Sequence, residues 1–132
     1  MKDFHFDAIA AFENYEIDKM SDGEVMVSTE VVKSSLNYYG NAHGGYLFTL
    51  CDQISGLVVI SQGSDGVTLQ SSINYLKAAK LGEHLTITGI CVHKGRTTRV
   101  VDVAIHNQEG EHICKATFTM FITGDRGEKV RI

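Results

Sequence analysis

The stretch from Asn41 to Ile60 constrains the fold more than any other part of this chain. It starts as a polar loop with two adjacent glycines and continues as a mostly apolar segment that contains one carboxylate, Asp52. At 100° per residue, several apolar side chains of this segment fall within a stripe of about 120°, which is the pattern of a helix buried along one face. These residues are Leu47, Leu50, Cys51, Ile54, Leu57 and Val58. We therefore expect one long helix that packs on a sheet.

The flanking segments alternate between apolar and polar residues, which is typical of strands with one buried face. Short turns separate the last four of these segments, so we expect them to form consecutive antiparallel neighbours. The expected strands cover 24–32, 67–76, 85–92, 98–106 and 112–123. Residues 4–19 carry apolar side chains at near-helical spacing and predict a short amphipathic helix. The expected fold class is α+β, with one antiparallel sheet packed on the central helix.

The composition limits the class of protein. The chain has 132 residues, enough for a single domain, which we expect to span 1–132. Its net charge of -4, without blocks of like charge, argues against nucleic acid or an anionic membrane as a partner. We find no apolar run of transmembrane length and no signal peptide, and the three cysteines lie in apolar segments, as buried free thiols do. We therefore expect a cytoplasmic protein.

Two common kinds of catalytic site are not indicated. The histidines have no ligand-like spacing with cysteine or aspartate, so we expect no metal site. The Gly-x-Ser-x-Gly motif of serine hydrolases does not occur either.

Two features of the central segment suggest chemistry, and each also has a plain structural interpretation. Asp52 is either a residue on a solvated strip, bonded to a nearby serine or threonine, or a general base or nucleophile in a semi-apolar cleft. His43-Gly44-Gly45 is either an ordinary helix start with His43 as its cap, or a site where free N–H groups bind a substrate oxygen. Glycine suits the second interpretation because no side chain keeps a ligand away from the backbone.

Helix geometry limits how these two features can cooperate. Gly44 and Asp52 are eight residues apart, which is about 12 Å along one helix axis. A carbonyl bound at the Gly44 N–H therefore cannot also lie within about 3 Å of the Asp52 carboxylate of the same helix. If both act on one substrate, Asp52 must come from another copy of the chain. An antiparallel pair of helices across a two-fold axis would give two equal sites per dimer.

The spacing of Asn37, His43-Gly44-Gly45 and Asp52 resembles that of the hotdog-fold acyl-CoA thioesterases of the phenylacetate-pathway and 4-hydroxybenzoyl-CoA type. The resemblance extends from about residue 25 to residue 122 and includes the segments 74–76, 79–83 and 94–97. It implies a hotdog fold, in which an antiparallel sheet wraps around one long helix. It further implies homodimers with a joint sheet that assemble into homotetramers, and hydrolysis of an acyl-CoA or aryl-CoA thioester without a further cofactor.

The resemblance also implies roles for individual residues. Asp52 matches the catalytic carboxylate, which acts as a base on water or as a nucleophile. Gly44 matches the residue whose N–H polarises the thioester carbonyl, and Asn37 matches a polar side chain near that group. Thr68 matches a strand hydroxyl that positions the attacking water. His43 is expected to orient the loop rather than to act as a base.

Further positions are candidates for substrate binding. Gly45 is expected beside the thioester together with His43, and a hairpin with Lys94, Arg96 and Thr97 is expected near the CoA phosphates. Other candidate cations are Arg99, Lys77 and Lys80. Any one of these charges, taken alone, is better explained as an ordinary surface charge, whereas the hairpin cations as a group are the better candidates, because the family places the nucleotide near such loops.

Two other functions are compatible with parts of the pattern. A non-catalytic acyl-CoA-binding or sensing domain could share the fold, since a fold does not define a function. A hotdog dehydratase or hydratase is a third possibility, although the acid/base histidine and aspartate pattern of those relatives is not evident. The acyl group is left open, because Tyr46, Phe48 and Val59 could line either an aromatic or an aliphatic pocket.

Overall fold

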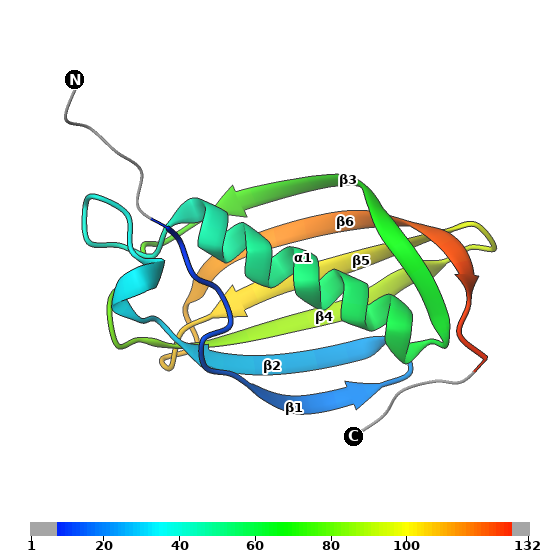
Figure 1. The fold of residues 1–132 in the computed structure, drawn as a ribbon, viewed down its shortest axis with the longest axis horizontal. Helices are drawn as coiled ribbons and strands as arrows, with labels where there is room; N and C mark the ends of the chain where they lie inside the picture. The colour runs from blue at the N-terminus through cyan, green and yellow to red at the C-terminus, as the bar shows by residue number, and fades with distance from the viewer. Residues whose placement is uncertain (1–7, 128–132) are drawn as a thin grey trace.

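The helix α1 lies across the concave face of one antiparallel sheet in the computed structural model, which describes residues 8–127 (Figure 1). The elements are β1 (Glu16–Ser21), β2 (Glu24–Glu30), the short 3-10 helix η1 (Lys33–Ser35), α1 (Gly44–Ser61), β3 (Ser64–Tyr75), β4 (His84–Lys94), β5 (Thr98–His106) and β6 (His112–Asp125). The sheet curves around the helix, so the α+β hotdog architecture is confirmed.

The buried face of α1 is wider than the predicted stripe. Leu57 is only partly buried, whereas Ser55 and Val59, which the helical projection places on the other side, are buried. The sheet wraps around the helix, so α1 contacts all six strands. Gly89 in β4 allows the closest approach, since a Cβ there would lie 2.7 Å from the Cγ2 atom of Ile54.

The prediction that no apolar run reaches transmembrane length is wrong for α1. By length and composition the helix could cross a membrane, with 18 residues and a mean hydropathy of 1.2. In this fold 50% of the helix is buried inside the protein. The sheet that covers it therefore explains its apolar character.

The strand order is β1-β2-β4-β5-β6-β3, with antiparallel pairs throughout residues 8–127. The predicted antiparallel neighbours β4, β5 and β6 are confirmed, but β3 does not lie beside β4. It pairs with β6 at the far edge, from Ser64 opposite Asp125 to Tyr75 opposite Cys114. The segment between β3 and β4 crosses the end of the sheet, where the Gly82 N–H donates to the Val31 carbonyl. This segment is too long for a tight hairpin turn, so it does not force its two strands to pair.

The predicted helix over residues 4–19 is wrong where the structure describes it. Residues 8–15 are irregular, β1 follows from Glu16, and residues 4–7 lie outside the described part. The pairing of β1 with β2 shifts register between Ile17 and Lys19. The helix-like apolar spacing lies before this shift, in the irregular segment where Ala11 and Phe12 pack against the core without forming a helix.

Candidate functional site

The first turn of α1 is closed by His43. Its Nδ1 atom accepts a hydrogen bond of 2.8 Å from the Gly45 N–H, which makes it the cap of the helix. The His43 N–H donates to the Ser35 carbonyl at 2.8 Å, and this fixes the loop that leads into the helix. A Cβ at Gly45 would lie 3.0 Å from the same Nδ1 atom. Gly45 therefore makes room for the cap, and its own N–H is already used.

The Gly44 N–H has no hydrogen-bond acceptor among residues 8–127. It sits at the positive end of the helix dipole, where a free donor attracts an oxygen with partial negative charge. The hydroxyl of Tyr75 donates to the Gly44 carbonyl at 2.9 Å and holds this residue against β3. Tyr75 was not among the predicted site residues, because its contact depends on the unexpected place of β3 at the sheet edge.

Asn37 lies beside Gly44 in the structure. Both line an open pocket of about 330 Å³, together with Tyr75 and Leu47. The Asn37 Oδ1 atom accepts from the backbone N–H groups of the turn that follows it, at 2.9 and 3.1 Å. Its Nδ2 group has no acceptor within the described residues, so this amide can donate to a ligand.

Asp52 pairs with Thr68 on the neighbouring strand β3. The Thr68 hydroxyl donates to the Asp52 Oδ1 atom at 2.7 Å, at a place where the register between β3 and β6 shifts. Asp52 is partly buried, and it forms no ion pair with a cation of the described residues. Ser55 does not take part, because its hydroxyl donates to the Asp52 backbone carbonyl at 2.7 Å. The carboxylate is therefore oriented by one neutral donor and has no cationic partner among the described residues.

The structure thus forms two separate clusters of candidate residues along α1. Asn37 and Gly44 lie together at its start, and Asp52 and Thr68 lie together near its middle. About 12 Å of helix separates Gly44 from Asp52.

Cys51 lies next to Asp52 but cannot serve as a nucleophile. It is fully buried, and its Sγ atom lies 3.9 Å from that of Cys114. The contact with the Cys114 thiol and the burial raise the pKa of Cys51 far above that of a free thiol. The expectation of free cysteines is confirmed, although Cys91 is only partly buried.

The hairpin cations lie far from Gly44 in the same chain. Lys94, Arg96 and Thr97 are exposed on the β4–β5 hairpin, at the end of the sheet opposite to the start of α1 (Figure 1). The candidate role of Arg99 is wrong in this respect, since Arg99 is only 6% exposed and donates to Gln62 at 3.1 Å. Arg99 ties the hairpin to the end of α1 rather than facing solvent.

Four other residues considered for substrate binding have partners in the structure: one forms an ion pair and three lie in or beside the core. Lys77 forms an ion pair of 3.3 Å with Glu111. Tyr46 and Val59 are buried in the core of this chain, so they do not line an open acyl pocket. Phe48 remains partly buried beside the core.

Known proteins resemble this chain over most of its length. The Thioesterase superfamily matches residues 39–114. The acyl-coenzyme A thioesterase PaaI of Escherichia coli is 34% identical over 103 residues, which cover 78% of this chain and 74% of the relative.

Two solved structures from streptococci are more similar. A hypothetical thioesterase protein of Streptococcus pneumoniae, solved with coenzyme A, is 78% identical with a TM-score of 0.93, covering 94% of this chain and 100% of that chain. A Streptococcus mutans protein bound to acetyl CoA is 63% identical with a TM-score of 0.85, covering 93% of this chain and 99% of that chain. The match to the family extends over more than half of the chain and includes Gly44, Asp52 and Thr68, so this protein belongs to the Thioesterase superfamily.

Proposed function

We propose that this protein hydrolyses acyl-CoA or aryl-CoA thioesters to the free acid and CoA. The observation that carries the proposal is the presence of two different chemical groups at two places along α1. A free N–H at Gly44 can bind an oxygen, and a carboxylate at Asp52 is held by the Thr68 hydroxyl. A hydrolase needs both groups, whereas a binding domain has no use for an oriented carboxylate near a thioester.

In the proposed reaction, the thioester carbonyl oxygen accepts a hydrogen bond from the Gly44 N–H, and the Asn37 amide lies beside it. The Asp52 carboxylate takes a proton from water, and the resulting hydroxide attacks the carbonyl carbon. The oxyanion that forms is stabilised at the positive end of the helix. The C–S bond then breaks, and CoA leaves as the thiolate, which takes up the proton from Asp52. In the other version of this step, Asp52 attacks the carbonyl itself and water later hydrolyses the anhydride.

The two groups meet only if a second copy supplies Asp52. Gly44 of one helix and Asp52 of an antiparallel partner helix face each other when the two-fold axis passes near Phe48, midway between them. This arrangement makes two equal sites in a homodimer, and the family resemblance adds assembly of such dimers into a homotetramer. A cytoplasmic location and the absence of a further cofactor complete the proposal.

The hairpin cations fit the same arrangement. CoA carries its thioester and its phosphates at opposite ends, so the phosphates must be bound well away from Asp52. The end of α1 at Ser61 is nine residues from Asp52, about 14 Å along the axis, and the hairpin with Lys94 and Arg96 adjoins that end. The partner that supplies Asp52 can thus also supply these cations.

Relatives support the choice of residues. The S. pneumoniae protein has also been solved as Asp52→Ala and Thr68→Ala variants, each 78% identical to this chain with a TM-score of 0.91.

The alternative is a non-catalytic acyl-CoA-binding or sensing domain. It predicts that CoA esters bind and remain intact.

A thiol-release assay distinguishes these functions. Purified protein is tested with short-chain, medium-chain, long-chain and aryl-CoA substrates, alongside Asp52→Asn, which keeps the size of the side chain and removes its charge. We expect turnover by the wild type and a loss of about 10²- to 10⁴-fold in the variant, as for removal of a general base. Retained CoA binding by the variant shows that its site is intact. Binding without turnover by the wild type would favour the sensing domain.

A further inference from the structure

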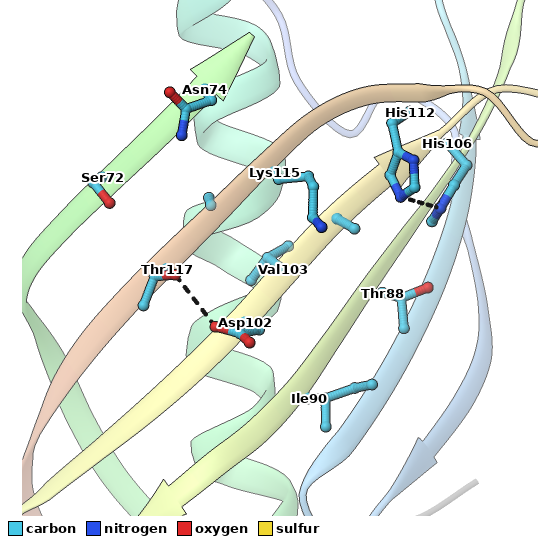
Figure 2. A pocket seen from close by; sticks show the side chains of 12 residues that line it. Ser72, Asn74, Thr88, Ile90, Asp102, Val103, His106, His112, Lys115 and Thr117 are labelled. Carbon is cyan, nitrogen blue, oxygen red and sulfur yellow. Dashed lines mark hydrogen bonds between the residues drawn. The ribbon is translucent and has the colours of Figure 1, made fainter. Parts of the chain in front are cut away.

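The face of the sheet that points away from α1 carries an open hollow of about 520 Å³. It is lined by residues of β3 to β6 that alternate with core residues, so it is separated from Asp52 by the thickness of the sheet. Figure 2 shows two histidines, His106 at the end of β5 and His112 at the start of β6, with their imidazole rings turned toward each other. The proposed hydrolysis does not use either of them.

A rigid turn holds the two histidines in place. His106 and His112 are direct partners in the β5–β6 ladder. The Asn107 Oδ1 atom accepts from the N–H groups of Glu109 and Glu111, at 3.0 and 2.9 Å, and Gly110 N–H donates to the Asn107 carbonyl at 3.0 Å. The position of the pair is therefore set before any ligand binds, which lowers the cost of binding.

The geometry of the rings suits chelation. The two Nε2 atoms of His106 and His112 share a hydrogen bond of 3.0 Å (Figure 2), and the ring centroids are 4.2 Å apart. Two nitrogens at this separation, each about 2.05 Å from one ion, subtend about 94° at that ion, close to the angle between neighbouring ligands in octahedral or square-planar sites. Rings joined head to head by a linear hydrogen bond would have centroids about 5.3 Å apart, whereas a chelating pair would have them about 4.7 Å apart. The observed centroid distance is closer to that of the chelate.

Other polar side chains line the same hollow beside the two histidines. Asp102 lies further along the same face and accepts a hydrogen bond of 3.2 Å from Thr117. No group of three or more candidate metal ligands occurs within residues 8–127, so water or another small ligand would complete the coordination.

We propose that His106 and His112 form a two-histidine site for a divalent transition-metal ion of the nickel, copper and zinc group. Imidazole is a preferred ligand of these ions, and the angle at the site suits nickel and copper better than tetrahedral zinc. The site is independent of the thioesterase reaction and lies on the opposite face of the sheet.

The test is a calorimetric titration of the metal-free full chain with Ni²⁺. We expect about one ion per chain, with binding weakened at least about tenfold in His106→Gln and in His112→Gln, because either change leaves a single imidazole. The control is His93→Gln, which alters an exposed histidine that does not line the hollow. It should bind nickel as the wild type does. Asp52→Asn should also retain binding, which separates this site from the proposed active site.

A second measurement guards against variants that fold poorly. The melting temperature without metal should be the same in wild type, His112→Gln and His93→Gln, since both positions are exposed. Addition of Ni²⁺ should raise it in the wild type and in His93→Gln but not in His112→Gln. Equal nickel affinity in wild type and the double variant of His106 and His112 would overturn the proposal. Equal weakening by His93→Gln would also overturn it.

Discussion

Gly44 and Asp52 should complement each other across two copies of the chain. Gly44→Pro is the informative change, because Gly44 is the first residue of α1, where proline is well tolerated and removes only the N–H. The preceding residue, His43, has φ -64 and ψ 137, which a following proline accepts. Gly44→Ala is the matched control, since its Cβ would lie 3.5 Å from the Tyr75 ring and the N–H remains.

The size of each effect follows from the proposed chemistry. Loss of one oxyanion donor lowers kcat by about 10²- to 10³-fold, or about 2.7–4 kcal/mol. Gly44→Ala should keep most of its activity. Gly44→Pro and Asp52→Ala should each be nearly inactive alone.

Mixing the two inactive variants tests where the site lies. In an equimolar sample with exchanged subunits, half of the dimers contain one copy of each variant, and one of their two sites combines the intact Gly44 with the intact Asp52. About a quarter of the wild-type activity per chain should therefore return. If both groups acted within one chain, every site would carry a lesion and the mixture would be no more active than its components.

The assay is thiol release from an acyl-CoA after subunit exchange or co-expression, with size-exclusion chromatography to confirm the assembled state. Two results would refute the reasoning. One is a mixture that is no more active than the mean of its parents despite proven exchange. The other is Gly44→Pro with the same kcat as Gly44→Ala, which would mean that the N–H has no role.

Three further substitutions test the surroundings of the site. Gly45→Ala places a Cβ 3.0 Å from the His43 Nδ1 atom, so loss of the cap should lower the free energy of unfolding by about 1 kcal/mol in urea; unchanged stability would contradict the importance of the cap. Gly89→Ala places a Cβ 2.7 Å from Ile54 and should cost about 1–3 kcal/mol in the same measurement, unless the helix can shift away from β4. Tyr75→Phe removes the hydroxyl bonded to the first carbonyl of α1, so kcat should fall about fivefold with an unchanged melting temperature; a kcat equal to that of the wild type would limit this hydroxyl to a structural contact.

The central part of the fold follows from local sequence patterns. The start of α1 at Gly44, with its glycines, and the strands β4 to β6, with their alternation and short turns, match their expected ranges closely. The predictions fail where pairing between distant segments determines the position of an element. The strand β3 lies at the sheet edge because it pairs with β6, a contact between distant segments that alternation cannot reveal. The apolar spacing before β1 resembles that of a helix, but Phe12 packs against the core from an irregular segment.

The candidate site was likewise predictable only in part. The separation of Gly44 and Asp52 follows from helix geometry alone, while the roles of Asn37 and Thr68 were inferred only from the family resemblance. Thr68 contacts Asp52 at a place where the pairing of β3 with β6 shifts register, and such a shift cannot be read from the sequence. Tyr75 was not predicted as a site residue, because it reaches the helix start only from a strand at the sheet edge.

The helix cap determines which glycine can serve a substrate. By their place in an uncapped helix, Gly44 and Gly45 are equivalent, since both expose an N–H at the positive end of the helix. His43 removes this equivalence by accepting the hydrogen bond of Gly45, and it thereby leaves Gly44 as the donor that faces the pocket with Asn37. A helix that offers one donor at its start and one carboxylate about 12 Å further on cannot complete a site alone. In the proposed antiparallel dimer the same spacing completes two sites, so a separation that excludes catalysis within one chain is what a site shared between two chains needs.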